Sequence, residues 1–287
     1  MPPRWFCAAV VLAWLGFNGW LFYHDILPRL LPDQPPPYTI DLVEEAQTRR
    51  PNIDWTVHLN GQKALQARTR IENPEHDVFE LTAEYKPIHG VPRVPLQGIL
   101  VRKMVSQYRV TAAGDLLGLS VVLTGAPQLA EVLKLGTEDF TVDIAGAVEG
   151  GQMEPTLQLQ MPGVGARRMT LPAVAVARGA SILLPLHPVN RLRGLRPGQA
   201  WTMRVLDPLA DSLGALHGTT GAAPVLRATV RPEIEAFTFG TRQDVPCHVI
   251  DYQGDGLTGQ TWVTADRGVV LCQDVRTGDN HMVMYRD

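Results

Sequence analysis

The chain has 287 residues, of which 45% are hydrophobic and 19% are charged, and its formal net charge is -3. This composition supports a sizeable core and excludes a disordered or collagen-like chain. The slightly acidic balance argues against nucleic acid as a partner, because a nucleic-acid-binding protein carries a clustered basic excess.

The N-terminal segment from Trp5 to Tyr23 contains no charged residue. Its length is close to the ~20 residues that cross a bilayer as a helix. Aromatic residues lie at both ends, as in the belts at membrane interfaces. We expect an uncleaved anchor, which makes the lipid bilayer a partner of residues 5–23. A cleaved secretory signal is the alternative, although Phe22 and Tyr23 stand where such a signal carries small residues.

Flanking charges set the expected orientation of this anchor. Arg4 precedes it and Arg29 is the only basic residue soon after it, which places the N-terminus in the cytoplasm. Prolines repeat within residues 25–37 and predict a stiff spacer. We therefore expect an anchor over 1–31, a Pro-rich spacer with a short helix over 32–52, and one β domain over 53–287. The protein would be single-pass in the cytoplasmic (inner) membrane, with its C-terminal domain in the periplasm.

Alternation of apolar and polar residues predicts strands over most of the remaining chain. The first covers 54–60 and ends at Asn60-Gly61, a strong signal for a tight hairpin, and its partner covers 63–72. A third strand contains Phe79, Leu81 and Tyr85 on one face. Further strands are expected over 99–112, 117–124, 138–146, 155–161, 200–206, 225–231, 247–253, 258–264, 268–275 and 281–285.

Three short helices are expected to interrupt the strands, over 39–49, 126–135 and 207–217. The last two stop at a glycine, which ends helices readily. Strands that follow one another without helical patterns between them predict an antiparallel meander. The apolar face of this sheet must be buried, either by curling of the sheet or by covering helices.

Catalytic and metal-binding patterns are absent from the sequence. Cys247 and His248 are adjacent, and on a strand their side chains point to opposite faces, so they cannot form a dyad. A disulfide between Cys247 and Cys272 stays open, although an intervening strand would separate them by ~9.5 Å, beyond the reach of ~7 Å. No zinc, nucleotide, hydrolase or kinase motif occurs. We predict no enzymatic activity, no metal and no cofactor.

Two segments carry a more distinctive pattern. In 188–208 a turn at Pro197-Gly198 precedes a strand that begins at Trp201. Near the C-terminus Thr-Trp-Val (261–263) is followed by Asp-Arg-Gly (266–268) and Val-Val-Leu (269–271). Together with the opening WTVHLNGQKALQARTRI, this pattern resembles the DUF3108-type bacterial envelope proteins and the wider family of LolA/LolB-like half-barrels.

The resemblance implies a mainly β fold, an antiparallel half-barrel of about 11 strands curled round short helices. In the lipoprotein carriers of this family the apolar concave face receives acyl chains. The residues expected on such a face here are Trp55, Val57, Leu59, Phe79, Leu81, Tyr85, Trp201, Met203 and Trp262. Two interpretations stay open, a filled core and a groove that accepts a ligand.

The expected function follows from these points. We expect a membrane-tethered, non-enzymatic domain that binds a hydrophobic ligand, a lipid or a lipidated partner such as a lipoprotein. The alternative is a tethered protein–protein interaction module of an envelope complex that binds no ligand.

Overall fold

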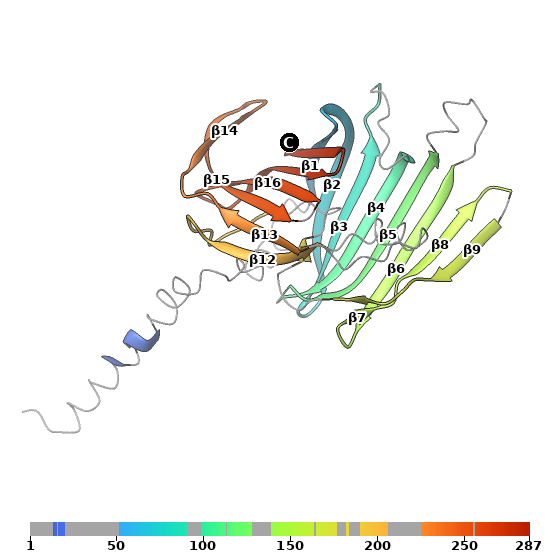
Figure 1. The fold of residues 1–287 in the computed structure, drawn as a ribbon, viewed down its shortest axis with the longest axis horizontal. Coiled ribbons are helices and arrows are strands. Elements are labelled where there is room, and N and C mark those ends of the chain that lie inside the picture. Colours follow the sequence, from blue (N-terminus) through green and yellow to red (C-terminus); the bar gives the residue numbers. More distant parts are fainter. Residues whose placement is uncertain are drawn as a thin grey trace, which may run out of the picture.

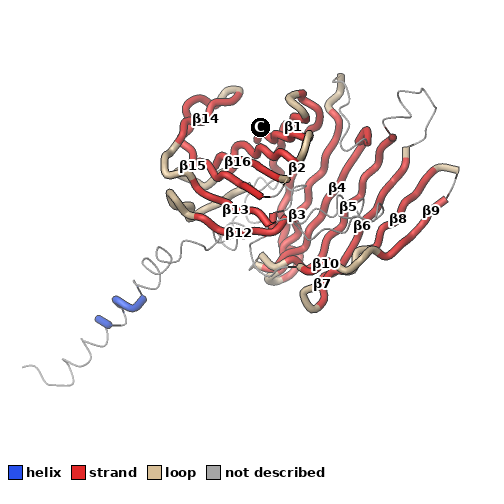
Figure 2. The backbone as a smooth tube through the Cα atoms, viewed as in Figure 1, coloured by secondary structure: helices blue, strands red, loops and turns tan. Residues whose placement is uncertain are grey.

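The computed structural model shows a chain dominated by β-strands (Figures 1 and 2). The residues that it describes are 14–15, 17–20, 52–90, 99–112, 114–127, 139–163, 165–176, 182–183, 190–205, 225–254 and 256–287.

Eighteen strands occur in these ranges. They are β1 (Asn52–Leu59), β2 (Gln62–Glu75), β3 (Val78–Pro87), β4 (Ile99–Thr111), β5 (Leu116–Pro127), β6 (Phe140–Glu149), β7 (Gln152–Met153), β8 (Thr156–Met161), β9 (Gly165–Thr170), β10 (Val174–Ala175), β11 (Ile182–Leu183), β12 (Ala200–Val205), β13 (Val225–Val230), β14 (Glu235–Phe239), β15 (Arg242–Gly254), β16 (Leu257–Thr264), β17 (Val270–Thr277) and β18 (Asn280–Arg286).

Neighbouring strands pair antiparallel in one continuous series. It runs β9, β8, β6, β5, β4, β3, β2, β1, β18, β17, β16, β15, β13 and β12. At its end β11 joins β12 in parallel, while β7 pairs with β6 and β10. No pairing between described residues connects β9 to the β11 end, so the sheet is curled and open. Figure 1 shows the long strands β3 to β6 beside a more strongly turned part around β13, β15 and β16.

The expected fold class, a mainly β chain with a curled antiparallel sheet, is confirmed, but the expected number of about 11 strands is wrong. Three of the additional strands, β7, β10 and β11, have two residues each, too few to show alternation. Strand β9 is exposed at almost every position, so its sequence shows no alternation of apolar and polar residues. Strand β14 has only five residues.

The predicted helices and anchor fall largely outside the described residues. Residues 39–49 and 207–217 lie outside entirely. Of the predicted helix over 126–135, residues 126 and 127 end strand β5, because β4 extends the ladder to them, and the others lie outside. Of the predicted anchor, residues 14–15 and 17–20 are described and are helical. Among the described residues, no helix is long and apolar enough to cross a membrane.

The β1–β2 hairpin has the predicted turn. Asn60 has φ of 51° and Gly61 has φ of 79°, and the flanking residues Leu59 and Gln62 are paired. Two consecutive positive φ values match the twist of a tight hairpin. A β-bulge between Val57 and His58 then shifts the register by one residue, and Trp55 and Val57 beyond it are both 0% exposed.

We call the side of the sheet that carries Trp55 the inner face. Cross-strand pairs continue from Trp55 through Ala67, Tyr85 and Met104 to Leu123, so one row of buried side chains crosses five strands. The same hydrophobic core extends over β12, β13 and β15 to β18. The inner face therefore forms one core that spans the whole sheet.

A second, smaller core lies on the opposite, outer face. Strand β14 and the first part of β15 form a hairpin over residues 235–247, which we call the arm. Phe237 of the arm packs with Trp262, and Phe239 stacks on Tyr285 with ring centroids 3.7 Å apart. At its tip Arg242 donates hydrogen bonds to the carbonyl oxygens of Arg286 and Asp287. The arm thus covers β16 to β18 from outside.

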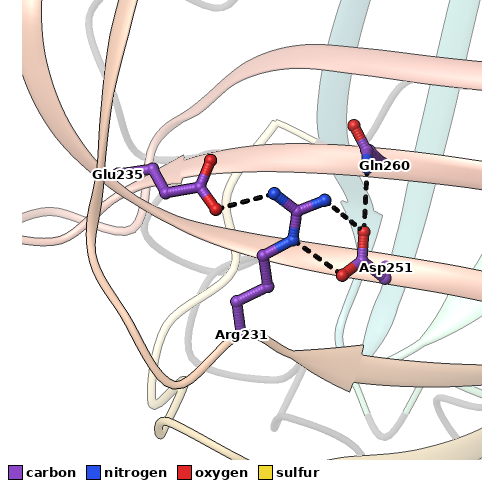
Figure 3. Close-up of polar contacts among 4 residues, drawn as sticks. All are labelled: Arg231, Glu235, Asp251 and Gln260. Carbon is purple, nitrogen blue, oxygen red and sulfur yellow. Dashed lines mark hydrogen bonds and ion pairs between the residues drawn. The ribbon is translucent and has the colours of Figure 1, made fainter.

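Arg231 ties the base of the arm to the sheet (Figure 3). Its guanidinium donates two hydrogen bonds of 2.7 Å to the Asp251 carboxylate and one of 2.6 Å to Glu235. Gln260 donates a further bond of 3.0 Å to Asp251. Hydrogen bonding from Arg231 is the main reason that the pKa of Asp251 lies below its usual value. The cluster connects β15 and β16 to the turn where β13 gives way to β14.

The hairpin turn can be tested by Gly61→Val, with Gly61→Asn as the control. Valine should lower the free energy of unfolding by ~1–2 kcal/mol, because a β-branched residue resists positive φ. Asparagine tolerates this conformation and should cost clearly less. Denaturant unfolding measures both variants. Equal midpoints for Gly61→Val and the parent would show that the turn is assigned wrongly.

The Arg231–Asp251 pair predicts a pH-dependent contribution to stability. Because the folded pKa of Asp251 is lowered, the pair stabilises the fold above the pKa of an unfolded aspartate, ~3.9, and this contribution is lost as the pH falls through the folded pKa. Near neutral pH, Asp251→Asn should cost about 1 kcal/mol, since both side chains are partly exposed and screened. The difference from the parent should shrink in acid. A difference that does not change with pH would contradict this assignment.

Candidate functional site

Eight of the nine predicted ligand-binding residues lie together in the inner-face core. All are at most 7% exposed, and they come from strands that are distant in sequence, namely β1, β3 and β12. They are Trp55, Val57, Leu59, Phe79, Leu81, Tyr85, Trp201 and Met203. The structure therefore brings these side chains into one apolar environment.

Trp262 lies on the other face, which corrects its predicted grouping with the inner-face residues. It pairs with Val249 and Cys272 and packs against Phe237 of the arm. Its neighbour Val263 points inward instead and is 0% exposed. Since side chains alternate along a strand, only one of these two residues can face the core.

The turn before β12 positions Trp201 as predicted. Gln199 donates its backbone N–H to the carbonyl of Arg196 at 3.0 Å, and Gly198 has φ of 75°. This geometry suits a type II turn, which requires positive φ at its third residue. Trp201 then lies opposite Ala228 of β13, whose small side chain leaves room for the indole ring.

A chain of buried hydrogen bonds begins at Trp55. Its indole N–H donates to Thr69 Oγ1 at 3.1 Å. The Thr69 hydroxyl lies 3.0 Å from Asn190 Oδ1 and 3.5 Å from the carbonyl of Ile53. A hydroxyl has one proton, and the shorter contact favours donation to Asn190. Trp55, Thr69 and Asn190 are all at most 4% exposed.

The segment containing Asn190 is fastened to the C-terminal strands. The carbonyl of Asn190 accepts hydrogen bonds from the backbone of Val270 at 3.1 Å and from the Arg286 guanidinium at 2.9 Å. Leu192 donates its N–H to Gly268 at 2.7 Å. A Cβ at Gly268 would lie 2.5 Å from the Leu192 carbonyl oxygen, so this close approach requires glycine. The Asp-Arg-Gly turn seen in the sequence therefore has a packing role.

Among the described residues, the buried side-chain nitrogens without a hydrogen-bond partner include Nε1 of Trp201 and Nδ2 of Asn190. Both residues contact the inner-face core and are only 2% and 4% exposed. A buried polar group without a partner costs ~1–3 kcal/mol, and most such groups in folded proteins are paired. These unpaired donors distinguish the inner face from an ordinary apolar core, and they are the polar features that a ligand could use.

Sequence reasoning missed Thr69 and Asn190. Thr69 lies on the same face of its strand as Leu65, Ala67 and Ile71. A single polar residue on an otherwise apolar strand face was therefore the available signal. Asn190 lies within the distinctive segment 188–208, but nothing in its sequence context indicates that it contacts Thr69.

The two cysteines among the described residues offer no reactive group. Cys247 and Cys272 are free and buried in the outer core. Burial raises the pKa of Cys247 to about 11 and also raises that of Cys272, which keeps both thiols protonated. The predicted meander of β15, β16 and β17 separates them by one strand, as expected. Among the described residues, no group of three or more His, Cys, Asp or Glu side chains could hold a metal ion.

A groove of about 450 Å³ lies on the outer face of β3 to β6, β8 and β9. Its lining includes small residues such as Gly118 and Ala145 and the charged residues Glu80, Arg109 and Arg168. None of the buried, unpaired side-chain atoms found among the described residues belongs to this lining. The inner face remains the better candidate for a binding site.

Known proteins do not identify this chain: no protein-family model, curated protein or solved structure matches it. The resemblance to LolA/LolB-like half-barrels therefore stays a prediction.

The indole N–H of Trp55 is hydrogen-bonded and that of Trp201 is not, and a phenylalanine substitution at each residue tests this difference. Trp55→Phe loses a paired donor and leaves Thr69 without it, whereas Trp201→Phe removes a donor that has no partner. The loss of unfolding free energy should be smaller for Trp201→Phe by about 1–2 kcal/mol. Denaturant unfolding of the purified variants measures the difference. An equal or larger loss at Trp201 would show that its N–H is satisfied.

Proposed function

We propose that the β domain binds a hydrophobic ligand, lipid or lipidated partner on its inner face and catalyses no reaction. The observation that carries this proposal is the unpaired Nε1–H of Trp201 within a largely apolar core. A ligand that contributes an oxygen atom beside apolar groups would pair this donor and remove its penalty. Binding sites for such ligands combine apolar walls with a few placed polar groups.

The inner-face residues supply suitable walls. Trp201 and Met203 of β12 share the core with Tyr252 of β15 and Trp55 of β1. Aromatic and methionine side chains adapt well to acyl chains, because they offer large apolar surface and, for methionine, flexibility. The same residues also fill the core without ligand, so binding requires them to repack or move apart.

The cellular setting is part of the proposal and rests on the sequence. The uncharged segment over residues 5–23 would tether the protein to the inner membrane, with the β domain in the periplasm. At this location the domain would meet lipids and lipidated proteins. Resistance of the full chain to carbonate extraction tests the tether.

Tryptophan quenching tests ligand entry directly. The reporter chain is the full-length protein carrying Trp5→Phe, Trp14→Phe and Trp20→Phe, which leaves Trp55, Trp201 and Trp262. The probe is dibromostearate, a long-chain carboxylate whose bromine atoms quench tryptophan on contact. Added to the reporter chain in detergent, it should quench the emission in a saturable way, because Trp55 and Trp201 are buried on the inner face.

The matched control adds Trp55→Phe and Trp201→Phe to the reporter chain. Only Trp262 then remains, on the outer face beneath the arm, and saturable quenching should disappear. If dibromostearate leaves the reporter chain unquenched, the proposed ligand site does not exist. The alternative, a tethered protein-interaction module with a closed core, then becomes the better account.

A further inference from the structure

We infer that Asn190 is the polar anchor of the inner-face site and binds the carbonyl or carboxylate oxygen of an acyl ligand through its Nδ2–H groups. This inference rests on the proposed function and names the head-group chemistry that the site would select. The ligand would be an amphiphile whose acyl chain lies among apolar residues and whose oxygen-bearing end reaches Asn190.

The side chain of Asn190 is held in one orientation before any ligand arrives. Thr69 donates to its Oδ1 at 3.0 Å, and Thr69 itself accepts the indole N–H of Trp55. With the oxygen end occupied, the amide nitrogen is the end that remains available, and it is buried and unpaired. Turning the amide over would leave Thr69 only the longer contact of 3.5 Å for its proton.

The backbone of Asn190 is fixed as well. Its carbonyl accepts bonds from Val270 and Arg286, so both halves of the residue are anchored to the sheet. A donor held in place by other bonds loses little freedom when a ligand binds, which strengthens recognition. Either N–H of the amide nitrogen can donate to one oxygen of a carboxylate or to the oxygen of an ester carbonyl.

The local charge favours an anionic ligand. The guanidinium of Arg286 lies 6.0 Å from the centre of the Trp55 ring and donates to the Asn190 carbonyl at 2.9 Å. It is half-buried, so its positive charge is only partly screened. A carboxylate near Asn190 would experience this charge, whereas an ester or an alkane would gain little from it.

Three probes separate the contributions of charge, oxygen and chain. They are dibromostearate, its methyl ester and a dibrominated alkane of similar length, each titrated into the reporter chain. The variants are Asn190→Leu, which removes the amide, and Asn190→Asp, which keeps an oxygen for Thr69 but removes the N–H donors. Thr264→Val is the matched control, because Thr264 is a buried polar residue (8% exposed) that pairs with Cys247 of the outer core.

Asn190→Leu should weaken dibromostearate at least tenfold and leave the alkane unchanged within twofold, and Thr264→Val should change neither. Asn190→Asp should weaken the carboxylate more than the ester. Stronger binding of the carboxylate than of the ester by the parent would identify the charged form as the ligand, and the reverse order would identify the ester. Thermal unfolding and alkane binding confirm that each variant retains the site.

Loss of the Asn190 contact and loss of the site itself give different results. If Asn190→Leu and Asn190→Asp both bind dibromostearate as the parent does, the inference about Asn190 is wrong and the proposed function stands. If the parent binds none of the three probes, the proposed function fails and the inference fails with it.

Discussion

Burial of one face of a sheet whose edges do not meet is the constraint on which the rest of this structure depends. A closed barrel has no free edges, whereas an open sheet buries one face only as far as its strands keep that face apolar. Cross-strand pairing aligns the apolar residues on this face across the sheet, from β8 near one edge to β12 near the other. Trp55, Tyr85 and Met104 lie in one row, and Trp201 lies near the β12 edge. One slip of register would turn such a row outward.

Part of the outer face is apolar as well and is buried separately. Strands β15 to β18 also carry apolar residues outward, among them Cys247, Cys272 and Val283, and these would be exposed without a cover. The arm over residues 235–247 supplies that cover, while Arg231 fixes its base and Arg242 its tip. The turned half of the sheet is thus stabilised from outside by the arm as well as from inside by the inner-face core.

Polar groups on the inner face stand out against this background. Trp55, Thr69 and Asn190 form a chain of hydrogen bonds, at the end of which Nδ2 of Asn190 has no partner. The indole N–H of Trp201 has no partner either. A buried donor without a partner costs ~1–3 kcal/mol, so stability alone does not account for these two nitrogens. They are the observation from which the proposed ligand is argued.

Local patterns predicted much of the sheet, and long-range contacts account for what they missed. Alternation and the Asn60-Gly61 turn were sufficient for β1 and β2, and Pro197-Gly198 was sufficient for the start of β12. Trp262 was assigned to the wrong face because neighbouring Val263 is equally apolar and only the pairing with β17 decides between them. The arm was missed because its five-residue strand pairs with the polar start of β15. Asn190 was missed because its contact with Thr69 joins residues 121 positions apart.

The most direct test of the central claim is organic extraction of the full-length protein, purified from membranes, followed by mass spectrometry of the extract. The account predicts an amphiphile with an acyl chain and a carboxylate or ester group, recovered in amounts close to one molecule per chain. Empty detergent micelles carried through the same purification give the background. If the extract holds no amphiphile above this background, and added dibromostearate also fails to bind, the inner face is a closed core and the account is wrong.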